Sequence, residues 1–204
     1  MNGTLPLLGS HAFRGLRIGI LGGSFNPAHE GHLHISLLAL KKLRLHAVWW
    51  LVSPQNPLKS EQGMAPFAER LKGAQRMAKP HPQIIVTDIE ARLGTRFTAD
   101  TLQKLRARFP ATRFVWLMGA DNLVQIPRWQ RWESIFKMVD IAVFRRPPYF
   151  VSAFHGLAAT RFAKSRLDAR KARLLGTAPK TQWILFNNRL HTASATRIRQ
   201  SSEK

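Results

Sequence analysis

The 204-residue chain contains no cysteine. This absence excludes disulfide bonds, thiol nucleophiles and cysteine-ligated metal centres. The chain also lacks any uninterrupted run of about 18 to 20 apolar residues, the length that a membrane-spanning helix needs. Its N-terminal stretch, MNGTLPLLGSHAFRG, has neither the charged start nor the apolar core of a signal peptide. We therefore expect no membrane association and a cytoplasmic location.

Acidic residues are scarce, with 11 Asp and Glu against 32 Lys and Arg, which gives a formal net charge of +21. Such an excess favours polyanionic partners such as nucleic acid, or anionic substrates. The basic segment Arg161 to Arg173 would carry a nucleic-acid-binding role. The same segment also fits a solvated helix face, and no aromatic-basic RNA motif or zinc finger accompanies it. Nucleic-acid binding is therefore the hypothesis that we favour less.

Internal repeats and low-complexity linkers are absent too. Apolar residues make up 45% of the chain, and twelve Phe and six Trp are spread through its apolar runs. This composition supports a folded core of ordinary size rather than a disordered basic tail. We expect a flexible N-terminal extension over residues 1–15 and a single domain over residues 16–204.

Strand and helix patterns alternate along the chain. Short apolar runs predict strands at 17–21, 46–52, 84–88, 113–118, 141–144 and 181–186. Helical patterns lie over 31–44, 66–78, 98–109 with Thr98 as the cap, 122–125, 128–136 after a break at Pro127, 151–175 and 194–200. The alternation predicts an α/β fold: a Rossmann-like, doubly wound, mostly parallel sheet of about six strands with helices on both faces. Ligands are expected at the carboxyl ends of the strands.

The segment from Leu16 to Ile35, LRIGILGGSFNPAHEGHLHI, reads as a strand, a glycine turn and a helix. Backbone N–H groups and a helix N-terminus would meet there, as in many phosphate sites. Gly22 and Gly23 would allow positive φ angles and close approach to a phosphate. A tight turn without a ligand stays the alternative. The segment is neither a Rossmann dinucleotide fingerprint nor a Walker A loop, because the required third glycine and the Gly-Lys-Ser/Thr are missing.

His29 and His32 stand at the mouth of this predicted helix in the sequence HEGH. The spacing is one residue short of the H-E-x-x-H that zinc proteases use, so it argues against that site. Two imidazoles beside a phosphate could donate hydrogen bonds to oxygens whose charge grows in a transition state. A helix-capping or surface role is the alternative for either histidine.

These residues also resemble the signature of a known protein superfamily. GGSFNPAHEGH resembles the G-x-F-x-P-x-H-x-G-H signature of the nucleotidylyltransferase superfamily, and SATRIR, Ser194 to Arg199, resembles its second signature, I-S-S-T-x-I-R or I-S-A-T-x-I-R. Ala193 replaces the usual isoleucine, and Ala195 matches only the second form. DIEARLGTRFTADTL, from Asp88, and MGADNLVQIPRW, from Met118, resemble segments of bacterial nicotinate-nucleotide adenylyltransferases. That family joins nicotinate mononucleotide to ATP and yields deamido-NAD and pyrophosphate.

The resemblance implies a nucleotidyltransferase domain and a set of ATP contacts. His29 and His32 would be the catalytic pair at the α-phosphate. The other phosphate contacts would come from both ends of the chain: Gly22, Gly23, Ser24, Phe25, Lys59, Ser194, Thr196 and Arg199. Mg²⁺ would arrive with ATP, held by phosphate oxygens and waters rather than by protein ligands.

The resemblance also implies a nicotinate mononucleotide site. Its ring would stack on Trp129, and backbone amides near Thr98 would hold the ring carboxylate. Asp121 could accept from a ribose hydroxyl or a metal-bound water, and Arg145 or, as we favour, Arg146 could meet the phosphate. The same fold also serves pantetheine-phosphate adenylyltransferases and cytidylyltransferases, and nicotinamide mononucleotide is a further possible acceptor. The sequence gives no oligomeric state.

Overall fold

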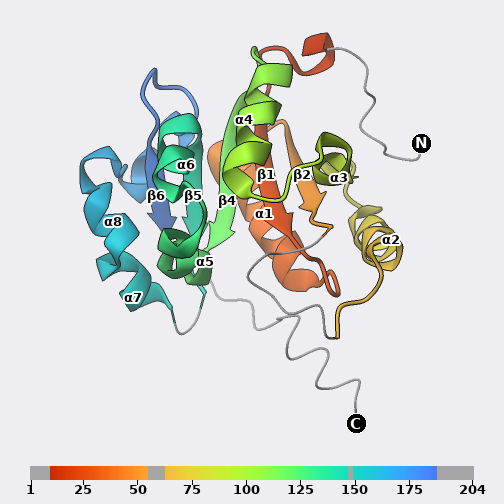
Figure 1. The fold of residues 1–204 in the computed structure, drawn as a ribbon. Coiled ribbons are helices and arrows are strands. Elements are labelled where there is room, and N and C mark those ends of the chain that lie inside the picture. The colour runs from red at the N-terminus through yellow and green to blue at the C-terminus, as the bar shows by residue number, and fades with distance from the viewer. Residues whose placement is uncertain (1–9, 55–62, 147–148, 188–204) are drawn as a thin grey trace.

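The computed structural model describes residues 10–54, 63–146 and 149–187 (Figure 1). The strands are β1 (Arg17–Gly23), β2 (Ala47–Val52), β3 (Ile84–Thr87), β4 (Arg113–Gly119), β5 (Asp140–Phe144) and β6 (Trp183–Phe186). The α-helices are α1 (Glu30–Leu43), α2 (Phe67–Ala78), α3 (Ile89–Leu93), α4 (Thr98–Arg108), α5 (Ala120–Gln125), α6 (Trp132–Met138), α7 (Phe150–His155) and α8 (Leu157–Arg161). Short 3₁₀ turns are η1 (Ser10–Phe13), η2 (Ile126–Arg128), η3 (Ala163–Ser165) and η4 (Ala169–Leu174).

The strands form one six-stranded sheet in the order β3-β2-β1-β4-β5-β6. Every neighbouring pair is parallel, as in the pairing of Ile20 with Trp49 on one side and with Trp116 on the other. The strand order reverses between β1 and β4, so the crossovers on the two sides of this point run in opposite directions. The predicted doubly wound sheet is confirmed, and its switch point lies where β1 and β4 end.

Helices cover both faces of the sheet, as predicted, and each face has its own core. On one face, Ile18, Ile20 and Trp49 pack with apolar residues of α4, α5, α6 and α8. On the other face, Leu21 and Trp50 pack with residues of α1, α2 and η4. Strand residues are therefore buried on both sides, which explains why the strands read as continuous apolar runs in the sequence.

Three local expectations are wrong in detail. Thr98 does not cap α4: the N-cap is Phe97, in an extended conformation and without a side-chain cap hydrogen bond, and Thr98 is already the first residue of the helix. The expected helix over 128–136 begins only at Trp132, because Arg128 still belongs to the turn η2, Trp129 is extended and Arg131 is left-handed at φ 52°. The expected helix over 151–175 is four short pieces ended by Gly176 at φ +83°, since its weak apolar periodicity gives no long stripe to bury.

The two ends of the chain differ in how much is described. Within the region that we expected to be a flexible extension, Ser10–Phe13 forms η1, and the Phe13 ring packs edge-on against Trp49 at 4.9 Å. The predicted helix 194–200 lies outside the described residues. Among the residues that the structure does describe, no helix is both long and apolar enough to cross a membrane.

Candidate active site

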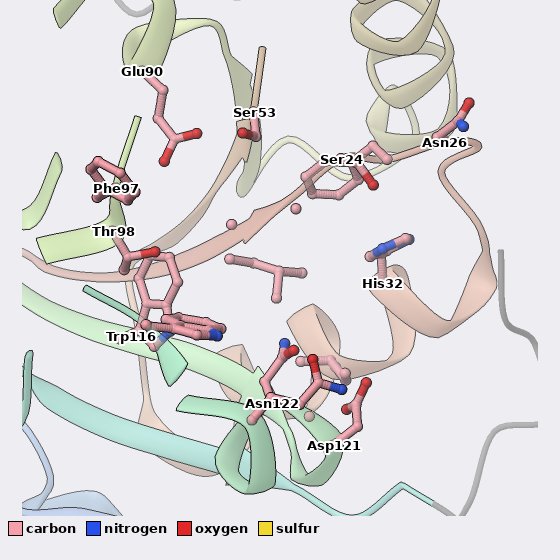
Figure 2. Close-up of a pocket in the computed structure, with 18 of the residues that line it drawn as sticks. Ser24, Asn26, His32, Ser53, Glu90, Phe97, Thr98, Trp116, Asp121 and Asn122 are labelled. Atoms are coloured by element: carbon pink, nitrogen blue, oxygen red, sulfur yellow. The ribbon is translucent and has the colours of Figure 1, made fainter. Parts of the chain in front are cut away.

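A cavity of about 400 Å³ opens at the carboxyl ends of β1 and β4, at the switch point of the sheet. In Figure 2, Ser24 and His32 lie on one side of this space, Phe97, Thr98 and Trp116 lie opposite, and Asp121 and Asn122 border it from the β4 side. The volume is in the range of small-molecule sites. Most of the predicted site residues that the structure describes line it: Gly22, Gly23, Ser24, Phe25, His29, His32, Thr98, Asp121, Trp129 and Arg146.

The glycines at the end of β1 belong to the strand rather than to the predicted turn, and their close approach to a phosphate stays a prediction. β1 extends through Gly22 and Gly23, and neither has a positive φ angle. A Cβ on Gly22 would lie 2.6 Å from the Trp116 ring, so glycine is needed here for close packing of β1 against the neighbouring strand. The left-handed residue is Phe25, at φ 48°, whose ring is buried and stacks on Trp50 at 5.1 Å.

His29 and His32 form the N-terminal cap of α1 and also line the cavity. The Nδ1 atom of His29 accepts from the Gly31 N–H, and the Nδ1 atom of His32 accepts from the His29 N–H, each at 3.1 Å. A neutral imidazole that accepts at Nδ1 carries its proton at Nε2, so both rings keep an Nε2–H donor. Their centroids are 3.9 Å apart. Capping and ligand contact are therefore compatible, because they use different ring nitrogens.

The cavity is also lined from the start of α4 and the end of η2. Phe97 and Thr98 line it from α4, and Arg128 and Trp129 line it from η2 and the residue after it. Trp129 is partly buried against the core beneath it. Thr98 and Trp129, which come from segments far apart in the sequence, thus line one cavity.

Asp121 and Arg146 form an ion pair at the third side of the cavity, with 2.8 Å between Arg146 Nη1 and Asp121 Oδ2. The other carboxylate oxygen, Oδ1, is buried and has no hydrogen-bond partner among the described residues. Arg145 does not line the cavity: its Nη1 donates to the Asn187 side chain. Of the two arginines left open by the sequence, the structure therefore brings Arg146 to the site.

Glu90, in α3, is a cavity-lining residue that sequence reasoning missed. Its side chain is almost fully buried, and burial raises its pKa from 4.5 to about 7, against the opposing effect of hydrogen bonds from Thr101 and Ser53. The Thr101 hydroxyl lies 3.3 Å from Glu90 Oε1. The sequence signal for this residue was its place in the family-like segment that begins at Asp88; its burial could not be foreseen, because it depends on β2 and α4 closing around it.

Lys59, Ser194, Thr196 and Arg199 lie outside the described residues. Further polar residues line the cavity without having been predicted: Asn26, Ser53, Arg96, Asn122, Gln125, Arg128 and Gln130. All of them except Ser53 and Gln130 lie in the family-like segments, which was the one available signal for them. The cavity is thus rich in hydrogen-bond donors and cations, which suits an anionic ligand.

This fold and site define a nucleotide-binding α/β protein of the nucleotidyltransferase type, with the site at the switch point of the sheet. The model of the cytidylyltransferase-like family matches residues 20–201. A protein of Parvibaculum lavamentivorans named "Probable nicotinate-nucleotide adenylyltransferase" is 54% identical over 91% of this chain and 92% of its own length. A Cereibacter sphaeroides protein of the same name is 51% identical, over 89% and 96%. The chain belongs to the nicotinate-nucleotide adenylyltransferase family and is an enzyme of the nucleotidyltransferase class.

Solved structures agree on the fold. The nicotinic acid mononucleotide adenylyltransferase of Plasmodium falciparum, complexed with NaAD, matches with a TM-score of 0.66 at 18% identity, over 91% of this chain and 83% of that one. The same enzyme complexed with APC gives a TM-score of 0.64. At these identities the likeness supports the Rossmann-like architecture.

Proposed function

We propose that this chain transfers AMP from ATP to nicotinate mononucleotide. A phosphate oxygen of the mononucleotide attacks the α-phosphorus of ATP, a new P–O bond forms, and the bond to the β-phosphate bridging oxygen breaks. The products are deamido-NAD and pyrophosphate. The observation that carries the proposal is the juxtaposition, in one cavity at the switch point, of the histidine pair, the end of β1 and the Trp129 wall.

The chemistry asks for alignment and charge neutralisation rather than for a nucleophile. In the proposed arrangement, the Nε2–H groups of His29 and His32 donate to oxygens of the α-phosphate. The N-terminus of α1 adds the positive end of a helix dipole at the same place. Ser24 and the backbone after β1 approach the same phosphate, and Lys59, Ser194, Thr196 and Arg199 would hold the β- and γ-phosphates.

The mononucleotide is proposed to lie against the opposite wall. Its ring stacks on Trp129, its ring carboxylate meets backbone amides near Thr98, and Arg146 meets its phosphate. The Asp121 Oδ1 atom is an unpartnered acceptor among the described residues, which fits a ribose hydroxyl or a water of a metal ion. Mg²⁺ would come with ATP and shield its phosphates, held mainly by phosphate oxygens and waters.

A panel assay tests this function. Purified protein is given ATP or CTP with nicotinate mononucleotide, nicotinamide mononucleotide or phosphopantetheine, and pyrophosphate release is measured. We expect ATP with nicotinate mononucleotide to give the highest kcat/KM. A higher value with phosphopantetheine or with CTP would move the chain to another branch of the superfamily. Salt-sensitive RNA binding without nucleotide turnover would favour the nucleic-acid alternative.

Replacing Trp129 by alanine tests the ring contact. We expect KM for nicotinate mononucleotide to rise by about tenfold, because an aromatic stacking partner contributes about 1.4 kcal/mol. KM for ATP should change little. Trp129→Phe keeps an aromatic face, so its KM for nicotinate mononucleotide should lie between those of the wild type and Trp129→Ala. An unchanged mononucleotide KM in the alanine variant would remove Trp129 from the site.

A further inference from the structure

Arg70, in α2, is a buried cation that contacts neither substrate in the proposed arrangement. Its side chain is only 4% exposed. Among the described residues it has no carboxylate within ion-pair distance. Burial lowers its pKa, but an arginine side chain stays protonated in proteins. A buried guanidinium without a carboxylate must be held by other acceptors, because an unpaired buried charge is costly.

Those acceptors are four backbone carbonyl oxygens. Nη1 donates to Ser24 at 2.6 Å and to Ser53 at 2.7 Å, Nη2 donates to Pro54 at 2.8 Å, and Nε donates to Ala65 at 2.9 Å. The planar fork of arginine suits this arrangement, because its donors point in fixed directions. One side chain thus connects the segments that follow β1 and β2 with the start of α2. The strand ends are also joined directly, by the Ser53 N–H donating to the Gly23 carbonyl at 2.9 Å.

The hydrogen bond to the Ser24 carbonyl connects Arg70 with the lining of the cavity. Ser24 and Phe25 line the cavity, whereas Arg70 does not. The Ser24–Phe25 peptide bond is trans, so its N–H points away from its carbonyl. Holding the carbonyl against Arg70 therefore turns the Phe25 N–H away from the guanidinium.

Phe25 needs such support, because its φ of 48° lies in the left-handed region that a bulky residue seldom adopts. Its ring is fixed on the other side by Trp50 and by His32, whose centroid is 4.6 Å away. Two sets of contacts, one to the preceding carbonyl and one to the ring, thus hold this backbone in place.

We propose that Arg70 is a positioning residue for adenylyl transfer: it fixes the Ser24–Phe25 peptide so that its N–H serves the α-phosphate site, and it adds a buried positive charge behind that site. The inference rests on the proposed function. Arg70 acts through the loop and touches no reacting atom. This role would explain why a cation that is held by carbonyl groups, with no carboxylate partner among the described residues, is kept in the interior of the protein.

The test compares Arg70→Met and Arg70→Lys with Arg76→Met, an exposed arginine on the same helix. ATP affinity is measured by equilibrium dialysis, and kcat is normalised to the folded fraction from near-UV circular dichroism. We expect Arg70→Met to lose tenfold or more in ATP affinity and in kcat per folded molecule. Arg70→Lys, which keeps the charge but not the fork, should recover part of both, and Arg76→Met should match the wild type.

Normal ATP affinity and normal kcat per folded molecule in both Arg70 variants would overturn the inference, even if their melting temperatures fell. If Arg70→Met does not fold, Arg70→Lys decides by the same criteria. Failure of the proposed function looks different: the wild type itself would not turn over nicotinate mononucleotide. The ATP affinities of the variants would then still decide the role of Arg70.

Discussion

Replacing His32 by alanine is expected to lower kcat by about 100- to 1000-fold, the loss typical of removing one preorganised donor to a developing charge. The ring lies in the cavity beside His29 and keeps an Nε2–H, because its Nδ1 atom accepts from the backbone. Steady-state rates of pyrophosphate release measure the effect. Near-normal turnover would show that His32 serves only the helix.

Because His32 also belongs to the cap of α1, its two roles must be separated. Loss of the cap should lower the free energy of unfolding by about 1 kcal/mol. His32→Gln places an acceptor at the same capping position, as in an ordinary capping box, but does not reproduce the imidazole donor. We expect this variant to regain stability without regaining rate. His34→Ala, on the same helix and outside the cavity lining, is the matched control and should stay close to the wild type in rate.

Replacing Glu90 by glutamine is expected to stabilise the protein at pH 8 and to leave it nearly unchanged at pH 5. Burial raises the Glu90 pKa from 4.5 to about 7, so the folded protein holds this proton more tightly than the unfolded chain does. Between pH 4.5 and about pH 7, unfolding therefore releases a proton, and the free energy of unfolding falls as the pH rises. Above about pH 7 the wild type bears the full cost of a buried, ionised Glu90 carboxylate, which lowers its free energy of unfolding by about 3 kcal/mol. Glu90→Gln does not bear this cost.

Urea unfolding at pH 5 and at pH 8 measures this difference. The wild type should lose stability between the two conditions by more than Glu90→Gln does, after the shared contribution of other groups is subtracted. Glu69→Gln, an exposed position on α2, is the matched control and should keep the wild-type pH dependence. Equal pH dependence in Glu90→Gln and the wild type would mean that the carboxyl is ionised in the folded state without penalty.

Much of the fold could be predicted because its signals are local. Apolar runs such as 46–52 and 113–118 mark strands that are buried on both faces, and their alternation with helical patterns leaves few topologies besides a parallel sheet. Errors occurred where a local signal competes with tertiary context. Thr98 is a good capping residue by type, yet the helix starts one residue earlier, with Phe97 as its cap.

The candidate site likewise contains residues that local sequence signals indicate and residues that only the tertiary structure reveals. Residues in recognisable segments, such as His29, His32 and Trp129, could be singled out from the sequence, and the structure brings them to one cavity. Glu90 and Arg70 were not singled out, because a glutamate or arginine in a helix is usually solvated. Only the packing of distant segments removes water from Glu90 and surrounds Arg70 with carbonyl groups.

The sequence by itself determined the strands, most of the helices, the basic charge and the histidine pair, since these depend on residue type and short spacing. The tertiary structure alone decided that Gly22 serves packing against Trp116 rather than a turn, and that Arg146 rather than Arg145 faces the cavity. The physical reason is that steric contact, desolvation and side-chain direction are set by neighbours far away in the chain. A sequence pattern does not contain those neighbours until the sheet has assembled.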